Sequence, residues 1–456
     1  MAPRPTSQPD RVWLAALGTA VATAEAAVLV LSPRDGLIAA RPVDALEHFE
    51  AADIERARRY GRGQLALAAM GGLAEGVLLV WLVRRARVED AQPAPADAGL
   101  EDASETAGPG VSAGAPAGFD APAVEQPLSL GVIGARGAGL SLALMLAPLP
   151  FGALMRTRAL RAGLATQSWR GWAGDVARSA ALGAGFTGAG AVVAAALMRR
   201  YGRDWWRAAA GGSVAVAVVV TLAGPVVLDP IFNDFEPLPE GELRREVLAL
   251  AQRAGVAIGE VFEVDASRRT SAANAYVNGL GASRRVVLYD TLLASFTPAE
   301  ARSVVAHELA HVRYRDVPRL LVYLALVAPA GTRAVARLAE RLSGSDEPEL
   351  PALALAGGVV SAALGVLTRQ LSRAIERRAD AFSLELTGDA DAFDSFERRI
   401  TRQNLADPDP PRWLALLLGT HPPIVERLGI AAAYRAGERA TPPRRPRWGP
   451  RTPANS

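Results

Sequence analysis

The chain has 456 residues, half of which are hydrophobic, and it contains no cysteine. The lack of cysteine excludes disulfide bonds, thiolate metal ligands and a cysteine nucleophile, so any metal ligand must be His, Asp or Glu. A formal net charge of +3 is too small over this length to indicate nucleic-acid binding. The abundance of Ala, Gly and Pro is typical of a GC-rich genome and predicts a bacterial source.

Apolar residues gather into blocks close to the length of about 20 residues that spans a bilayer as a helix. The third, fourth and seventh blocks are rich in Gly and Ala, which favours close helix packing in lipid. Several blocks end in arginine pairs, which favours membrane helices over the buried helices of a large soluble protein. The blocks lie near residues 12–32, 64–83, 128–150, 178–198, 207–228, 319–340 and 350–371. We therefore predict a polytopic α-helical membrane protein with about seven transmembrane helices.

These helices divide the chain into membrane and non-membrane segments. Residues 89–127 are rich in Pro, Ala and acidic residues without periodicity, which predicts a disordered linker. Arginines in loops 33–63 and 151–177 favour a cytoplasmic position for these loops and for the non-membrane part of the chain. The predicted segments are helices one and two (1–88), the linker (89–127), helices three to five (128–228), a first non-membrane segment (229–318), helices six and seven (319–371), a second non-membrane segment (372–435) and a basic disordered tail (436–456).

The first non-membrane segment has the composition of a small α/β domain. Residues 275–277 and 285–289 are rich in β-branched and aromatic residues and are predicted as strands. Thr297 and Glu300 predict a capping box, and Pro298 stands at the first helical position. A helix is therefore expected to begin here and to continue into the next motif.

Residues 307–311 read His-Glu-Leu-Ala-His. On a helix, His307 and His311 lie on one face, so their ring nitrogens can bind a single metal ion. Glu308 lies beside that face and can act as general base toward a water on the metal. Only four histidines occur in the chain, so this spacing favours a metal site over two unrelated surface histidines.

A catalytic zinc site usually takes a third protein ligand, which here must be His421 or an acidic residue. Glu376 is the best candidate, because a helix continuing from the last apolar block could carry it into the site. Asp380 lies one turn later on the same face and could accept the free N–H of a ligating histidine. Taken alone, these two acids also fit an ordinary charged helix face.

Other short motifs accompany the His-Glu-Leu-Ala-His sequence over roughly residues 130–430. In chain order they are Leu-Pro-Phe at 149–151, Gly-Leu-Ala-Thr-Gln-Ser at 163–168, Trp-Ala-Gly-Asp at 172–175, Asp-Pro-Ile-Phe-Asn at 229–233, Phe-Glu-Pro-Leu at 235–238, Asn-Ala-Tyr at 274–276, Val-Val-Leu-Tyr-Asp-Thr-Leu-Leu at 286–293, Ser-Arg-x-x-Glu-x-x-Ala-Asp at 372–380 and His-Pro-Pro at 421–423 followed by Arg427. With these motifs, the chain resembles the type 1 CAAX prenyl protease family of integral-membrane zinc metalloproteases. The motifs outside the membrane blocks are also similar to those of the HtpX-like membrane proteases.

This resemblance implies a metal site with one Zn²⁺ per chain. His307, His311 and Glu376 would ligate the zinc, and Glu308 would be the base and proton shuttle. Asp380 would not contact the zinc but would accept a hydrogen bond from a ligating histidine. The resemblance thus implies a small α/β zinc metalloprotease domain whose His-Glu-x-x-His motif lies on a helix.

The resemblance also implies how a substrate would be held. Asn274 would lie on an edge strand that pairs with the backbone of the substrate. His421, together with Asn274, would stabilise the oxyanion, because an amide under attack develops negative charge on its carbonyl oxygen. Arg427 would support the site. The fourth histidine, His48, lies among acids in a polar loop and is expected to be a solvated residue.

We therefore predict a membrane-embedded zinc metalloendopeptidase that cleaves membrane-associated or lipidated peptides by metal-activated water. Its partners would be a peptide or protein substrate and the lipid bilayer, but not nucleic acid, and the sequence predicts no oligomeric state. Its expected location is the bacterial plasma membrane, with the protease domain on the cytoplasmic side. Two alternatives remain open: an HtpX-like quality-control protease with broad substrates and fewer helices, and a catalytically silent membrane scaffold.

Overall fold

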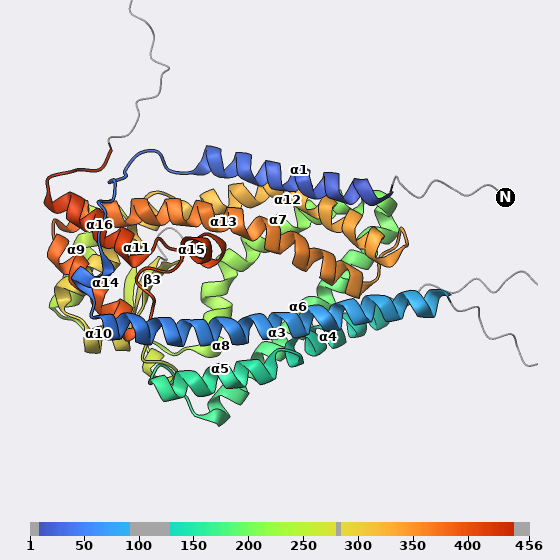
Figure 1. Cartoon of the computed structure of the whole chain (residues 1–456), viewed down its shortest axis with the longest axis horizontal. Coiled ribbons are helices and arrows are strands. Elements are labelled where there is room, and N and C mark those ends of the chain that lie inside the picture. Colours follow the sequence, from blue (N-terminus) through green and yellow to red (C-terminus); the bar gives the residue numbers. More distant parts are fainter. Residues whose placement is uncertain (1–8, 92–127, 280–283, 442–456) are drawn as a thin grey trace, which may run out of the picture.

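The computed structural model describes residues 9–91, 128–279 and 284–441. Long helices make up most of this structure, and a small sheet with shorter helices lies at one end (Figure 1). Most of the predicted linker 89–127 and of the predicted basic tail 436–456 lies outside the described residues, so those two predictions stay untested.

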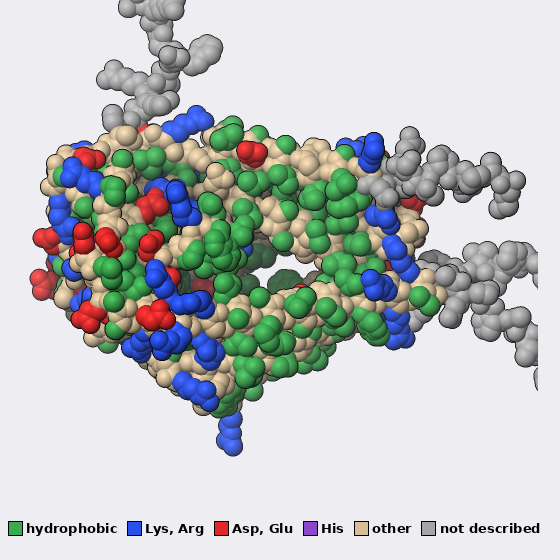
Figure 2. All heavy atoms as spheres, viewed as in Figure 1, with side chains coloured by type: hydrophobic (Ala, Val, Ile, Leu, Met, Phe, Trp, Pro, Cys, Tyr) green, Lys and Arg blue, Asp and Glu red, His purple; other side chains and the backbone are tan. Residues whose placement is uncertain are grey.

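The long helices form two groups with an opening between them (Figure 2). In one group α1 packs along α12 and α13, and α7 packs against α12; in the other, α4 packs along α6, and α5 packs against α3. The first group comprises α1 (Pro9–Leu31), α7 (Trp205–Ala223), α12 (Asp316–Ser343) and α13 (Leu350–Thr387). The second comprises α3 (Ala51–Ala91), α4 (Leu130–Leu146), α5 (Leu149–Ala162) and α6 (Trp169–Tyr201).

In the described part of the chain, five helices are long and apolar enough to cross a membrane, or up to six if the bent pair α4–α5 forms one span. One of these five, Trp169–Phe232, contains both α6 and α7, which are separated by the 3-10 turn η1 (Gly202–Asp204). The predicted blocks at 178–198 and 207–228 therefore fall in a single helical stretch broken at this turn. The structure confirms a helical architecture with several candidate membrane spans, while the count of seven stays a prediction.

Helices α4 and α6 approach each other closely through glycine, as the Gly/Ala-rich composition of their blocks predicts. A Cβ atom on Gly137 would lie 2.7 Å from the Cβ of Ala191, and one on Gly188 would lie 2.9 Å from the carbonyl oxygen of Gly134. Neither position has room for a side chain. Small residues at a helix crossing bring the two backbones close together, which is how helices gain packing energy in lipid.

Helix α3 begins at Ala51, well before the apolar block predicted at 64–83. The predicted loop 33–63 is thus partly helical, and it also contains the short helix α2 (Ala45–His48). The first turns of α3 carry Glu55, Arg58 and Arg59, so hydropathy alone does not distinguish them from a polar loop. Arg58 donates to Asp407 at 3.2 Å and so ties this part of α3 to the segment between α14 (Ala390–Gln403) and α15 (Arg412–Leu418).

The sheet has the strand order β1-β2-β4-β3. Strands β2 and β4 pair in parallel, whereas β1 pairs with β2 and β3 pairs with β4 in the antiparallel sense. The bounds are β1 (Phe235–Pro237), β2 (Glu260–Val264), β3 (Ala275–Asn278) and β4 (Arg285–Tyr289). The strands predicted at 275–277 and 285–289 are confirmed, while β1 and β2 were not predicted.

The core beside the sheet is apolar and includes Val261, Val286, Leu288, Val305 and Leu309, all fully buried. The last two belong to α11, which therefore packs directly against the sheet. The remaining elements are η2 (Gly224–Leu228), α8 (Asp229–Phe232), α9 (Glu242–Arg253), η3 (Ala266–Arg268), α10 (Asp290–Ser295), α11 (Pro298–Arg313), α14 (Ala390–Gln403), α15 (Arg412–Leu418) and α16 (Ile424–Arg435).

Candidate metal centre

Helix α11 carries the first part of the site and is held firmly at its start. The Thr297 hydroxyl accepts from the backbone N–H of Glu300, and the Glu300 carboxylate accepts from the backbone N–H of Thr297, so both halves of the capping box are present. Glu300 is buried and also accepts a 2.6 Å hydrogen bond from Arg399. The helix that begins here presents His307 and His311 one turn apart on the same face.

Helix α13 brings a carboxylate to these two histidines. The Nε2 atom of His307 lies 3.1 Å from Oε2 of Glu376, and the Nε2 atom of His311 lies 3.7 Å from Oε1 of the same residue. The three residues offer ligand atoms that all lie within 4.8 Å of one another. Helix α13 runs without a break from Leu350 through Glu376, so a helix that starts as an apolar span ends at this group.

The other ring nitrogen of His307 is held by Asp380. Its Nδ1 atom lies 2.9 Å from Oδ1 of Asp380, which is completely buried. Arg427 on α16 binds both oxygens of that carboxylate, with Nε at 2.9 Å from Oδ2 and an Nη atom at 2.5 Å from Oδ1. Arg427 also donates to buried Glu397 at 2.7 Å. Burial lowers the pKa of Arg427, but the Asp380 and Glu397 charges outweigh this effect and raise it above its usual range.

The second histidine has an equivalent support in Asp316, which the sequence analysis missed. The Nδ1 atom of His311 lies 3.1 Å from Oδ2 of buried Asp316. Arg319 and Arg378 donate to the other oxygen of Asp316, at 2.8 and 2.5 Å. Arg315 precedes Asp316 in a left-handed conformation (φ 56°), which ends α11 and turns the chain back toward His311.

The donor set fits a zinc ion. Two imidazoles and one carboxylate are a ligand set found in catalytic zinc sites. In both histidines Nε2 faces Glu376 while Nδ1 contacts a buried aspartate, an arrangement that orients ligating histidines. Burial opposes the charged form of His307, but hydrogen bonds and charge from Asp380 and Glu376 prevail and raise the pKa of His307 to about 10. The surroundings therefore favour a positive charge at this point, which a metal ion supplies.

Glu308 lies beside the group and has no competing partner. The described part of the chain offers its carboxylate no hydrogen bond or ion pair, although the side chain is partly buried. Burial raises the pKa of Glu308, and the nearby positive charges of His307 and His311 oppose that rise. A raised pKa makes the Glu308 carboxylate a better proton acceptor, as a general base requires.

His421 also reaches the group, whereas Asn274 lies at the adjacent strand. The Nε2 atom of His421 is 3.3 Å from Oε2 of Glu376, and its side chain is 59% exposed. Buried Arg373 donates to the carbonyl of Gly419 at 2.6 Å and so fixes the segment just before His421. Asn274 is exposed immediately before β3, the edge strand beside α11. Hydrogen bonds and ion pairs thus connect six of the eight predicted site residues, while Glu308 lies beside them and Asn274 lies at the adjacent strand.

His48 differs from its prediction as a solvated residue. Its ring is 22% exposed, and Nδ1 lies 3.9 Å from Oδ1 of Asp394 on α14. The backbone carbonyl of His48 also accepts a hydrogen bond from Arg402. His48 thus contacts the protease domain away from the metal group, because α2 packs near α14.

Replacing Arg427 by Ala is expected to lower the free energy of unfolding by about 3–5 kcal/mol, because Asp380 and Glu397 would remain buried without a counter-charge. Thermal or denaturant unfolding of the purified chain measures this change. Arg377→Ala is the matched control. Arg377 on α13 pairs with Glu426, which lies next to Arg427 on α16, but the Arg377 side chain is 38% exposed. That control should cost at most about 1 kcal/mol. Equal losses for both variants would show that the buried network contributes no special stability.

Comparisons with known proteins agree with this site. A family model described as peptidase family M48 matches residues 237–434, the range that contains all eight predicted site residues. The metalloprotease YhfN of Bacillus subtilis is 33% identical over 243 residues, which are 51% of this chain and 57% of that protein. A CAAX prenyl protease 1 homolog of Oryza sativa is 32% identical over 228 residues, 48% of this chain and 53% of that protein. The chain thus spans about half the length of the curated relatives it matches.

The crystal structure of S. mikatae Ste24p shares the fold over nearly the whole chain. The TM-score is 0.65 at 18% sequence identity, and the alignment covers 94% of this chain and 100% of that chain. The similarity extends to the long helices α1 and α3 to α7, which precede residue 237 and which the family model does not cover. The long helices and the sheet region therefore belong to one shared fold.

Proposed function

Because the comparisons support membership in the CAAX protease family of membrane metalloproteases, we propose that the chain is a membrane-embedded zinc metalloendopeptidase. Its substrates are membrane-associated or lipidated peptides, and its cofactor is one Zn²⁺ per chain. We further propose that it resides in the bacterial plasma membrane with the protease domain on the cytoplasmic side. The observation that carries this proposal is the group formed by His307, His311 and Glu376.

In this proposal, the three residues of that group hold the zinc through the two Nε2 atoms and the Glu376 carboxylate. When bound, zinc acts as a Lewis acid that lowers the pKa of a water molecule and polarises the substrate carbonyl. Glu308 takes the proton from the attacking water and passes it to the leaving amine. Its raised pKa suits both steps, because the same carboxyl group must gain and then lose a proton.

The substrate would lie along β3. Among the described residues, this strand pairs with β4 on one side only, so its other edge offers backbone donors and acceptors to an extended peptide. His421, near Glu376, and Asn274, at the start of β3, would donate to the carbonyl oxygen as negative charge develops on it. Recognition through backbone atoms depends on the extended conformation of a peptide more than on its sequence.

Cleavage of a quenched fluorescent peptide by the detergent-purified chain tests this function. We expect cleavage that stops on treatment with a zinc chelator and returns on addition of Zn²⁺. Comparing one peptide with and without a C-terminal lipid tests the substrate class, and the proposal expects faster cleavage of the lipidated form. Cleavage that persists after complete removal of metal would contradict the proposed chemistry.

Asp316→Asn is expected to weaken zinc affinity about 10- to 100-fold, because Asp316 orients the ring of His311 and increases its basicity. Asn keeps the size of the side chain but removes its charge. Competition with a chromophoric zinc chelator measures the affinity independently of activity. Asp346→Asn is the matched control, since Asp346 is 63% exposed and pairs with Arg203 away from the site. Unchanged zinc affinity in Asp316→Asn would remove Asp316 from the proposed site.

An HtpX-like quality-control protease with broad substrates remains the alternative within the same chemistry. Comparable cleavage of unrelated unfolded membrane proteins and lipidated peptides would favour it. The alternative from another class is a catalytically silent membrane scaffold. A scaffold has no need of a carboxylate such as Glu308, which lies beside the metal group without a partner among the described residues. A purified chain that binds zinc but cleaves nothing would favour the scaffold.

A further inference from the structure

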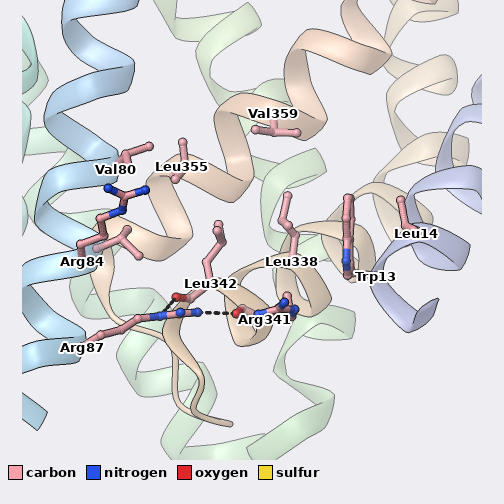
Figure 3. A pocket seen from close by; sticks show the side chains of 11 residues that line it. Trp13, Leu14, Val80, Arg84, Arg87, Leu338, Arg341, Leu342, Leu355 and Val359 are labelled. Carbon is pink, nitrogen blue, oxygen red and sulfur yellow. Dashed lines mark hydrogen bonds between the residues drawn. The ribbon is translucent and has the colours of Figure 1, made fainter. Parts of the chain in front are cut away.

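A cavity lies between the long helices, at the end of the molecule opposite the sheet and the metal group. Its volume is about 660 Å³, within the range of roughly 300–1,000 Å³ typical of small-molecule sites. Four helices enclose it: α1, α3, α12 and α13 (Figure 3). Helix α3 belongs to one group of long helices, and α1, α12 and α13 belong to the other, so a ligand in this cavity would contact both groups at once.

The cavity has an apolar wall and a basic rim. Trp13 and Leu14 face it from α1, Val80 from α3, Leu338 from α12, and Leu355 and Val359 from α13 (Figure 3). Among the described residues that line it, the only charged ones are three arginines, at positions 84, 87 and 341. A cavity with this lining favours a ligand that has a long apolar part and a negative charge at one end.

The arginines of the rim differ in their contacts. Arg87 donates to the backbone carbonyls of Leu342 and Arg341 at the end of α12, which fixes its position at the rim. Arg84 lines the cavity together with Val80 and Leu355 (Figure 3). No hydrogen bond or ion pair with another described residue engages the Arg84 side chain. Arg84 is thus a cation at the cavity with its donors available.

The place of the cavity along the helices fits the boundary of a bilayer. The apolar run of α3 ends at Val83, directly before Arg84. Trp13 lines the cavity and Trp81 on α3 is 53% exposed, and tryptophan is enriched where membrane meets water. Figure 2 shows hydrophobic side chains over the middle of the molecule and basic side chains at this end. A bound amphiphile would therefore have its charge at headgroup level and its chain in the hydrocarbon.

We propose that this cavity is a binding site for one anionic phospholipid, with the phosphate at Arg84 and an acyl chain along the apolar wall. The planar guanidinium of arginine binds phosphate groups through paired, charge-assisted hydrogen bonds. A zwitterionic lipid offers the same chains without the net charge and would bind more weakly. The bound lipid would join α1 and α3 across α12 and α13, at the end of the molecule away from the metal group.

Native mass spectrometry of the purified full chain tests the site by titration with dioleoyl phosphatidylglycerol and, separately, dioleoyl phosphatidylcholine. We expect one phosphatidylglycerol per chain, bound at least about fivefold more tightly than phosphatidylcholine. Arg84→Gln should remove this preference by weakening phosphatidylglycerol binding about fivefold. Arg85→Gln is the matched control, because it removes the same charge from the next residue of α3, which does not line the cavity.

A second variant tests the apolar wall. Val359 is 43% exposed and lines the cavity, so Val359→Trp fills the space with little strain on the fold. It should reduce binding of both lipids, while peptide cleavage at the distant metal group stays unchanged. Equal affinity for the two lipids, or an Arg84→Gln variant that behaves like Arg85→Gln, would overturn the proposal. Full displacement of phosphatidylglycerol by millimolar inorganic phosphate would also overturn it, because the site would then bind a free anion.

Discussion

Replacing Glu308 by Gln is expected to lower the rate of peptide cleavage by about 10²- to 10⁴-fold, the usual contribution of a general base. Gln is nearly the same size but cannot accept the proton from water. Zinc should stay at one per chain, because Glu308 is not part of the group formed by His307, His311 and Glu376. The measurement is the initial rate of cleavage together with metal content by mass spectrometry of the same preparation.

The control for this variant is Glu242→Gln. Glu242 is exposed at the start of α9, which packs against α11, so the substitution changes the same charge in the same domain. Its cleavage rate should match that of the wild type. A Glu308→Gln variant with full activity would remove Glu308 from the reaction, and one that loses its zinc would make Glu308 part of the metal site.

Glu376→Gln is expected to weaken zinc binding by more than about 100-fold, beyond the effect of losing a supporting residue. A neutral amide is a poor zinc ligand, and the two remaining imidazoles do not complete a three-ligand site. Cleavage should be lost with the metal. The zinc affinity is measured by chelator competition, which reports on the site even when cleavage is undetectable.

Glu385→Gln on the same helix is the control for Glu376. Glu385 is exposed and accepts a hydrogen bond from the backbone N–H of Ala440, away from the metal group. It should bind zinc as the wild type does. If Glu376→Gln keeps its zinc while His311→Ala loses it, the third ligand is another residue, and His421 at 3.3 Å from Glu376 is the nearest alternative.

Local sequence signals predicted the parts of the site that lie within single elements. The capping residues Thr297 and Glu300 indicated where α11 begins, and the four-residue spacing indicated that His307 and His311 share a face. Glu376 and Asp380 were predicted as one face of a helix continuous with an apolar span, and α13 is that helix. In each case the information lies in spacing along one helix, where position in sequence determines position in space.

Features that depend on contacts between elements could not be predicted in the same way. Asp316 lies five residues after His311, a spacing that places two residues on different faces of a straight helix. It reaches His311 because Arg315 adopts a left-handed conformation that no Gly or Asn signals. Arg427 on α16 pairs with Glu397 on α14. Nothing in the sequence around either residue indicates which residue it pairs with.

The central claim is that His307, His311 and Glu376 hold a catalytic zinc served by Glu308. Its most direct test is zinc content and peptide cleavage measured together for the wild type, Glu308→Gln and Glu376→Gln. The account predicts one zinc with cleavage in the wild type, one zinc without cleavage in Glu308→Gln, and neither in Glu376→Gln. A wild type without zinc, or a Glu376→Gln variant that retains both zinc and cleavage, would contradict it.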